Sequence, residues 1–455
     1  MTASFKYTAK GWISRLAREG WAFRRLIGKL NESQWYSPEA LAMLQNRRLQ
    51  AMVRYAARQV PYYRELFNTG NVSWKEIQSI SDLSRIPVLE KDDLLKGGER
   101  FLPRGMRKYL LLKARISGTT GKPLTVYRDY HSVNFERANV HRLWKQAGYR
   151  FGDPFVTIRG EAICETHGSR KRYWAMNHIH NELVMSSFHL SGKTMADYWD
   201  RIISFNPSYI YCYPQSLLTL LNYAEETDYP LHSLAVKGVF TSSETVAPFL
   251  RKRVKKLLGC PIVDYYNTAE RVVPIASCEY GNYHVLEDCG IAEFFPVDPE
   301  RHLYEIVGTG LTNRGMPLFR YRTRDIVEYI QDVPPCPCGR HFRQVKQIIG
   351  RPAEHIIGAH GRLISGAGLT HIFYGKDTQV IETQVIQQDE KQIRLRIVPS
   401  DFFSEQHKAV LSDAFEKYTG IVPDIEVVSS IERTDSGKFR FILKPSDKDM
   451  PKNHE

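Results

Sequence analysis

The stretch from residue 209 to residue 266 alternates between short apolar runs and longer segments with a helical spacing of hydrophobic side chains. The runs at 209–213, 236–240 and 261–266 predict strands, and the segments between them predict helices because apolar residues recur there every three or four positions. Gly259 follows the second helix, at the position where a left-handed glycine commonly ends a helix. This strand–helix order predicts an α/β fold with a parallel sheet and right-handed crossovers.

Polar loops follow two of these predicted strands. The first, at 241–244, reads Thr-Ser-Ser-Glu, and the second, at 267–270, reads Asn-Thr-Ala-Glu. Ligands of open α/β sheets bind beyond the carboxyl ends of the strands. We therefore expect Glu244 and Glu270 to lie at one edge of the sheet, where a small molecule would bind.

The pattern changes after Arg351. An alternating apolar run predicts a strand there, a helical segment ends at Gly420, and a further strand follows. The 105 residues of this part are enough for a separate α+β domain. We therefore predict a large N-terminal domain over 1–350 and a small C-terminal domain over 351–455.

The first thirty residues form a basic helical extension. They hold seven bases and one acid, so +6 of the chain's net charge of +13 comes from this segment. Its apolar residues follow a roughly helical spacing, interrupted by glycines. Such a helix can dock on the protein with its charges in water, or make a peripheral contact with an anionic membrane. Elsewhere no zinc-finger, RNP or helix-turn-helix signature accompanies the excess charge, which argues against nucleic acid as a partner.

The overall composition is that of an ordinary globular protein. Hydrophobic residues make up 42% and charged residues 25% of the chain, which excludes a wholly disordered, collagen-like or coiled-coil protein. No apolar stretch is long enough to cross a membrane, and we find no secretory signal at the N-terminus. Seven thinly spread cysteines do not form a disulfide framework, so we expect a cytoplasmic protein.

The sharpest motif is the glycine-rich string at 117–123, which reads Ser-Gly-Thr-Thr-Gly-Lys-Pro. Its glycines allow backbone amides to approach an anion, and its lysine supplies a positive charge. It is not a Walker A loop, because only two residues separate the glycines and proline follows the lysine. Predicted strands flank the string, so a glycine-rich hairpin turn is the alternative to a phosphate-binding loop.

Five segments, read in order, resemble the signatures of the adenylate-forming (acyl-AMP) ligase superfamily. The string at 117–122 resembles its phosphate-binding motif. Segments 266–270 and 321–325 are similar to its Tyr-Gly-x-Thr/Ser-Glu and Tyr-Arg-Thr-Gly-Asp motifs. Gly350-Arg351 stands where the hinge motif begins, and 436–438 resembles the catalytic-lysine motif.

Within this superfamily the chain most resembles the phenylacetate–CoA ligase family. The branch is the one of capsular polysaccharide biosynthesis and coenzyme F390 synthetase-like proteins, and segments 308–313, 317–321, 336–340 and 433–440 carry the resemblance. It spans nearly the whole chain beyond residue 40. It implies a large adenylate-forming domain with parallel sheets and helices, followed by a small mobile α+β domain.

The resemblance also implies a nucleotide site. The glycine-rich loop would hold the phosphates of ATP through Ser117, Gly118, Thr119, Thr120, Gly121 and Lys122. Glu270 would coordinate Mg²⁺, which prefers carboxylate and phosphate oxygens, and Asp325 would accept hydrogen bonds from the ribose hydroxyls. The adenine would be framed by Ser243, Glu244, Tyr266 and Asn267.

Catalysis falls to Lys438 and Glu270 by the same resemblance. The small domain would deliver Lys438, which would stabilise charge while a carboxylate oxygen attacks the α-phosphorus of ATP. Arg351 would belong to the cofactor-binding hinge. This is electrostatic catalysis of an in-line displacement, with little proton chemistry.

Three residues depart from the superfamily pattern. Ala269 replaces the usual hydroxyl residue before Glu270, which removes one contact to phosphate or to a Mg²⁺-bound water. Arg324 replaces glycine before Asp325 and restricts the backbone of that turn. Glu354 would have to serve as the hinge carboxylate.

The cysteines offer a second candidate site. Cys278, His284, Cys336 and Cys338 supply three thiolates and an imidazole, the ligand set of a tetrahedral structural zinc. Relatives that carry zinc at this place favour the metal. Buried free thiols are the alternative, since Cys-x-Cys is less diagnostic than Cys-x₂-Cys.

The sequence thus predicts an ATP-dependent, AMP-forming carboxylate ligase. It would convert a small carboxylic acid to an acyl-AMP and pass the acyl group to CoA, to a carrier-protein thiol or to an amine, with a role in surface-polysaccharide biosynthesis. A homodimer is a further expectation. The competing prediction is a degenerate adenylation fold that binds without catalysis at a membrane surface.

Overall fold

The computed structural model describes the greater part of the chain. The residues described are 3–18, 20–70, 72–116, 124–161, 163–167, 170–191, 193–351, 355–359, 363–373, 378–389, 391–434 and 438–445. The glycine-rich loop at 117–123 therefore lies outside them, as do 352–354 and 435–437. No helix among the described residues is both long and apolar enough to cross a membrane.

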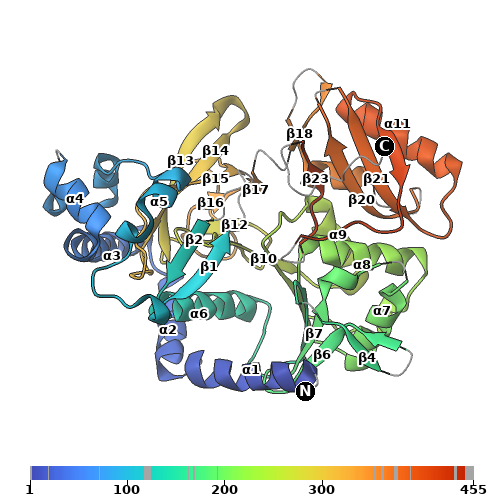
Figure 1. The fold of residues 1–455 in the computed structure, drawn as a ribbon, viewed down its shortest axis with the longest axis horizontal. Coiled ribbons are helices and arrows are strands. Elements are labelled where there is room, and N and C mark those ends of the chain that lie inside the picture. Colours follow the sequence, from blue (N-terminus) through green and yellow to red (C-terminus); the bar gives the residue numbers. More distant parts are fainter. Residues whose placement is uncertain are drawn as a thin grey trace. The chain divides into compact units, whose positions relative to one another are not determined.

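The chain divides into two compact units (Figure 1). Unit 1 consists of Met1–Ile13, Ala147–Asp264 and Gly350–Glu455. Unit 2 consists of Ser14–Gln146 and Tyr265–Ile349. A unit boundary thus falls at residue 350, but unit 1 also joins the C-terminal segment to the middle of the chain. The division into domains 1–350 and 351–455 stays a prediction.

The helices and strands of unit 1 cover its three chain segments. From the first two segments they are α1 (Ala3–Arg18, which continues into unit 2), β3 (Phe155–Arg159), β4 (Glu165–His167), β5 (Arg170–Arg172), β6 (Trp174–Asn177), β7 (Glu182–Ser186), α7 (Met195–Phe205), β8 (Tyr209–Cys212), α8 (Pro214–Glu226), β9 (Gly238–Ser242), α9 (Pro248–Leu258) and β10 (Ile262–Tyr266, which also continues into unit 2). From the third they are β18 (His355–Ile357), β19 (Leu363–Ser365), α10 (Gly366–Phe373), β20 (Val380–Gln387), β21 (Ile393–Pro399), α11 (Glu405–Thr419), β22 (Asp424–Val427) and β23 (Ile442–Leu443).

Parallel strands form the centre of unit 1. β3 pairs in parallel with β7 and with β8, and β8 pairs in parallel with β9. The buried faces of α7, α8 and α9 pack in the same hydrophobic core as these strands. The strands and helices predicted over 209–266 are all present, and Gly259 has the predicted left-handed conformation, with φ +70°. The predicted α/β class with a parallel sheet is therefore confirmed.

The C-terminal segment adds a second sheet to unit 1, in the order β22-β21-β20-β23. β20 and β21 are antiparallel, whereas β21 pairs in parallel with β22 and β20 pairs in parallel with β23. Hydrogen bonds tie this sheet to α8, where the Asn222 amide donates to the Ile381 carbonyl over 3.1 Å. The predicted α+β pattern, with Gly420 at the end of α11, is confirmed.

Unit 2 is built from helices, hairpins and short sheets. They are α2 (Trp21–Ser33), α3 (Pro38–Gln59), α4 (Pro61–Thr69), α5 (Lys91–Gly97), β1 (Leu112–Ile116), β2 (Leu124–Arg128), α6 (Tyr130–Gln146), β11 (Ile275–Ser277), β12 (Tyr283–Val285), β13 (Gly290–Asp298), β14 (Leu303–Gly310), β15 (Tyr321–Glu328), β16 (Gln344–Val345) and β17 (Gln347–Gly350, whose last residue is in unit 1). Short 3₁₀ turns of both units are η1 (Trp74–Glu76), η2 (Ile80–Arg85), η3 (Gly98–Phe101), η4 (Lys108–Leu110), η5 (Ser187–His189), η6 (Leu231–Ser233) and η7 (Pro299–Arg301).

Two predicted features of unit 2 can be placed. β1 and β2 form an antiparallel pair with Ile116 opposite Leu124, so the strands expected on either side of the glycine-rich loop are present. The basic extension consists of two helices, and the second belongs to the core. Phe23 and Leu30 of α2 are buried, and the Leu30 carbonyl accepts a hydrogen bond from Arg142 over 3.1 Å.

Candidate functional site

The carboxyl ends of β3, β8 and β9 form a polar edge in unit 1. The Arg159 guanidinium, at the end of β3, donates to Ser242 Oγ over 2.6 Å and to Ser243 Oγ over 3.1 Å. It also lies 4.5 Å from the ring centroid of Tyr211 and 4.4 Å from that of Tyr213. Cation–π contacts and hydrogen bonds of this kind hold a side chain in one position. Arg159 thus clamps the loop that follows β9.

Glu244 lies in that loop with its two carboxylate oxygens in different situations. Oε2 accepts a hydrogen bond from the backbone N–H of Gln215 over 3.1 Å, while Oε1 is buried without a hydrogen-bond partner among the described residues. Burial raises the pKa of Glu244 to about 7, against the opposing effects of the Gln215 N–H and of the Lys438 charge. The carboxyl group therefore changes protonation near neutral pH.

Lys438 reaches the same loop. Its ammonium group donates to the Ser243 carbonyl over 3.4 Å. Two hydrogen bonds hold Lys438 beside Thr434: the Lys438 N–H donates to Thr434 Oγ1 over 3.1 Å, and the Thr434 N–H donates to the Lys438 carbonyl over 3.0 Å. The backbone of Ser243 is left-handed, with φ +74°, an uncommon conformation for a residue with a side chain. The structure thus brings Ser243, Glu244 and Lys438 together within unit 1.

A buried ion pair seats the segment that carries Lys438. The Arg433 guanidinium pairs with the Glu382 carboxylate on β20, and both side chains are almost fully buried. Glu382 also accepts a hydrogen bond from Thr219 of α8 over 3.2 Å, and Arg433 lies 4.7 Å from the ring centroid of Phe439. Strand β20 and helix α8, which are distant in sequence, therefore hold the segment that carries Lys438.

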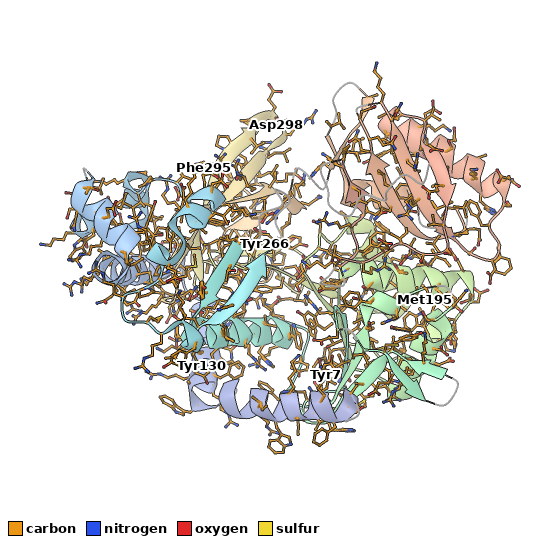
Figure 2. All side chains as sticks on the ribbon, viewed as in Figure 1. Tyr7, Tyr130, Met195, Tyr266, Phe295 and Asp298 are labelled. Carbon is orange, nitrogen blue, oxygen red and sulfur yellow. The ribbon has the colours of Figure 1, made fainter. Side chains whose placement is uncertain are left out.

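Unit 2 holds Tyr266, Asn267 and Asp325 of the predicted nucleotide site, together with Glu270. The Tyr266 hydroxyl, at the end of β10, donates to Asp325 Oδ2 over 2.7 Å, and the Tyr321 hydroxyl donates to Glu270 Oε1 over 2.9 Å. Both carboxylates are largely buried. Figure 2 labels Tyr266. Carboxylate oxygens of this kind accept hydrogen bonds from ligand hydroxyls and coordinate metal ions.

Neighbouring polar groups hold the 266–270 loop in shape. The Arg128 guanidinium donates to the Ala269 carbonyl over 3.0 and 2.8 Å, and burial lowers the pKa of Arg128 while the Glu270 charge opposes that shift. The Asn267 amide donates to Glu136 Oε2 over 2.8 Å. The Asn267 side chain therefore helps to hold the 266–270 loop against α6.

The departure at Arg324 has a conformational cost. Its backbone is left-handed, with φ +64°, which glycine adopts freely and other residues adopt at about 1–2 kcal/mol. An ion pair of 2.8 Å between the Arg324 guanidinium and Glu90 accompanies this conformation. Arg324 lies within β15, at an irregularity in the pairing with β14, and this left-handed position before Asp325 is kept without glycine.

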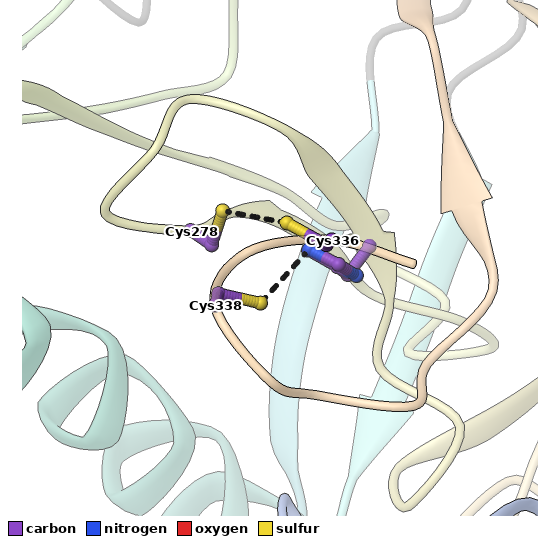
Figure 3. Close-up of side chains that lie close together, drawn as sticks. Cys278, Cys336 and Cys338 are labelled. Atoms are coloured by element: carbon purple, nitrogen blue, oxygen red, sulfur yellow. Dashed lines mark hydrogen bonds between the residues drawn. The ribbon is translucent and has the colours of Figure 1, made fainter. Parts of the chain in front are cut away.

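The three cysteines and the histidine of the second candidate site converge in unit 2, although 58 residues separate Cys278 from Cys336. Figure 3 shows the three thiols facing one another. The ligand atoms all lie within 4.8 Å of one another, with 3.7 Å between the sulfurs of Cys278 and Cys336 and 3.5 Å from Cys338 Sγ to His284 Nε2. A tetrahedral zinc with bonds of about 2.3 Å to sulfur and about 2.0–2.1 Å to nitrogen requires separations of about 3.8 and about 3.6 Å.

The surroundings of this cluster also fit a metal. His284 Nδ1 lies 3.3 Å from the Phe342 carbonyl, and a hydrogen bond there leaves Nε2 free to act as a ligand. The Asn282 amide donates to Cys336 Sγ over 3.2 Å, which suits a thiolate. The donor set fits a structural zinc site, and the Cys278–Cys336 and Cys338–His284 separations are close to those that such a site requires.

The structure does not place every residue that was predicted for the nucleotide site. Arg351 is described, and its carbonyl lies 2.9 Å from His355 Nδ1, but Glu354 and the glycine-rich loop lie outside the described residues. Glu244 and Glu270 belong to different units, so their expected position at one edge stays a prediction.

Two residues with a clear place in these sites, Arg159 and Glu136, were not predicted from the sequence. Arg159 is the last residue of an apolar run, where a parallel strand ends, and that position could have marked it. Glu136 lies within α6, and nothing in the local pattern marks it.

Comparisons with known proteins agree with the predicted resemblance. A family model described as the CapK C-terminal domain matches residues 356–445. Protein CapK from Staphylococcus aureus is 24% identical over 403 residues, which cover 88% of this chain and 88% of CapK. A phenylacetate-coenzyme A ligase from Thermus thermophilus is 27% identical over 393 residues, which cover 82% of this chain and 85% of that ligase.

A solved structure shows the same fold. The crystal structure of 2-hydroxyisobutyryl-CoA ligase in the postadenylation state, in complex with R3-HIB-AMP, superposes with a TM-score of 0.69 at 18% identity. The match covers 90% of each chain. Together with the sequence matches, it confirms the predicted resemblance.

Proposed function

We propose, since the chain is a phenylacetate–CoA ligase-like protein with the adenylate-forming fold, that it is an ATP-dependent, AMP-forming carboxylate ligase. The observation that carries the proposal is the position of Lys438. Its ammonium group lies against the Ser243–Glu244 loop, at the carboxyl ends of parallel strands, where ligands of such sheets bind.

In the first step, a carboxylate oxygen of the acid attacks the α-phosphorus of ATP, an acyl–phosphate bond forms, and pyrophosphate leaves. Lys438 would stabilise the negative charge on the phosphoryl oxygens, as a preorganised cation does in phosphoryl transfer. The hydrogen bond between Lys438 and Thr434 and the Arg433–Glu382 ion pair would together hold that cation in place before ATP arrives. The loop at 117–122 would hold the remaining phosphates.

The residues of unit 2 would hold the sugar and the metal. Asp325, which Tyr266 holds by a hydrogen bond, would accept hydrogen bonds from the ribose hydroxyls. Glu270 fits Mg²⁺, because Tyr321 occupies one of its oxygens and a hard cation takes the other. Bound Mg²⁺ would supply charge neutralisation at the phosphates.

In the second step, a nucleophile takes the acyl group and AMP leaves. A thiol, as in coenzyme A, is the acceptor favoured by the phenylacetate-coenzyme A ligases among the relatives, with a carrier-protein thiol or an amine as alternatives. The similarity to protein CapK supports a role in surface-polysaccharide biosynthesis. The Cys278, His284, Cys336 and Cys338 cluster would bind one structural zinc, outside the reaction.

ATP–pyrophosphate exchange tests this proposal. Purified chain, ATP and Mg²⁺ are incubated with labelled pyrophosphate and a panel of aromatic, short hydroxylated and sugar-derived acids. We expect at least one acid to stimulate exchange and, when CoA is added, to yield an acyl-CoA detectable by mass spectrometry. ATP binding without exchange across the panel would instead favour the non-catalytic binding protein.

A further inference from the structure

Helix α1 packs on unit 1 through its small and polar face. Ser4 Oγ accepts a hydrogen bond from the Met176 N–H over 3.1 Å, and the Tyr7 hydroxyl donates to Glu161 Oε2 over 2.6 Å. Gly11 lies on the same face and is buried. A larger side chain there would collide with the side chain of Asn177, at the end of β6. Figure 2 labels Tyr7 on this helix.

The opposite face of α1 carries large apolar side chains that are exposed. Phe5 is 57% exposed, Trp12 52% and Ile13 68%. At 3.6 residues per turn these three positions lie on one side of the helix, away from Ser4, Tyr7 and Gly11. Exposed Lys6 lies beside them, and exposed Lys10, which pairs with Glu161 over 3.6 Å, lies between the two faces. The amphipathic helix is thus docked with its apolar face outward.

This orientation is the reverse of what burial of apolar surface favours. A helix on a protein surface normally turns its apolar side to the core and its charged side to water. Large apolar side chains left outside along one side of a helix, with a basic residue beside them, are typical of a surface that contacts something else. The hydrogen bond that Ser4 accepts from Met176 and the one that Tyr7 donates to Glu161 keep α1 in this orientation.

We propose that the Phe5, Trp12, Ile13 face of α1 docks on an anionic membrane surface, with its apolar side chains among the lipid headgroups and acyl chains and its lysines at the lipid phosphates. Tryptophan and phenylalanine with adjacent lysines are the residues that interfacial helices use. The positive charge decides against a second copy of the chain as the occupant. A two-fold interface through this face would set the same lysines of both copies close together.

Vesicle flotation with the full-length chain tests the proposal. The vesicles are pure phosphatidylcholine, or equal parts of phosphatidylcholine and phosphatidylglycerol. The wild-type chain should float with the anionic vesicles and not with the neutral ones. Trp12→Ser/Ile13→Ser should abolish flotation, and Lys6→Gln should weaken binding about fivefold, the effect of one basic residue near an anionic surface. Phe402→Ser, which removes an aromatic residue that is 66% exposed elsewhere in unit 1, is the matched control and should bind like the wild type.

Every result of this experiment either supports or contradicts the membrane proposal. Absence of wild-type flotation, or equal flotation of Trp12→Ser/Ile13→Ser, would overturn it. A wild-type dimer that the double variant converts to monomer, without vesicle binding, would assign the face to a second copy. All the variants keep the adenylation residues, so ATP–pyrophosphate exchange separates this proposal from the enzymatic one and reports whether each variant is folded.

Discussion

Replacement of Lys438 by alanine separates the two chemical steps proposed for this chain. The ammonium group donates a hydrogen bond of 3.4 Å to the Ser243 carbonyl, at the exposed side of the loop. Its loss should lower the free energy of unfolding by less than about 1 kcal/mol. Loss of one preorganised charge contact to the transition state costs about 10²–10³ in rate, or about 2.7–4 kcal/mol. The effect on the first step therefore exceeds the effect on stability.

Single-turnover kinetics measures each half-reaction of purified Lys438→Ala. Acyl-AMP formation from acid and ATP should slow by about 10²–10³. Acyl transfer from chemically supplied acyl-AMP to the thiol should proceed close to the wild-type rate. In that step the thiol attacks the acyl carbon, and the α-phosphorus is not the reacting atom. Lys417→Ala is the matched control: Lys417 is an exposed lysine of the same C-terminal segment, paired with Asp413 over 2.7 Å, and its loss should change neither step.

Acyl-AMP formation at the wild-type rate in Lys438→Ala would refute the reasoning. It would mean that the charge beside Ser243 does not act on the transferring phosphoryl group. Equal slowing of both steps would also count against it, because the residue would then support the bound acyl-AMP in general.

Three further predictions concern the groups around this site and the cysteine cluster. The pKa of Glu244 is raised to about 7, so the folded state binds more protons than the unfolded state, and the free energy of unfolding should fall as the pH rises from about 5 to about 7. Urea titrations across this range should show a flatter profile for Glu244→Gln; an unchanged slope would place the titrating group elsewhere. Glu382→Gln should lower the free energy of unfolding by about 3–5 kcal/mol, because the buried Arg433 charge loses its partner, and the added change Arg433→Met should recover much of that loss. A double variant as unstable as the sum of the single ones would contradict this. Untagged protein should contain about one zinc per chain by metal analysis. Cys338→Ser should lose the zinc while exposed Cys164→Ser keeps it, and zinc-free wild-type protein would contradict the assignment.

Hydrophobic periodicity alone determined the central part of the fold. The strands and helices from β8 to β10 lie within about two residues of their predicted positions, because each buries one face and the spacing of apolar residues records which kind of element does so. Gly259 and Gly420 mark helix ends for a local reason, since their left-handed backbones suit glycine. The polar loops after β9 and β10 followed from the same pattern.

The site itself depended on contacts between distant segments. The Arg433–Glu382 pair joins residues 51 positions apart, and the cysteine cluster joins two turns separated by 58 positions. Neither distance nor geometry can be inferred from spacing in sequence, because both depend on how the strands between them are paired. Ligand types and the family resemblance suggested zinc, whereas a sulfur–sulfur and a sulfur–nitrogen separation close to those of a tetrahedral site came only from the folded chain.

In helix α1 the sequence pattern predicts the helix, and tertiary contacts determine the direction in which its apolar side faces. The spacing of Phe5, Trp12 and Ile13 predicts an amphipathic helix with one apolar side, and the usual rule turns that side to the core. The folded chain turns it outward. Ser4 and Tyr7 find hydrogen-bond partners in Met176 and Glu161, and Gly11 permits a close approach that larger residues would prevent. Orientation depends on these partners, more than 150 positions away in sequence, and periodicity within one helix carries no information about them.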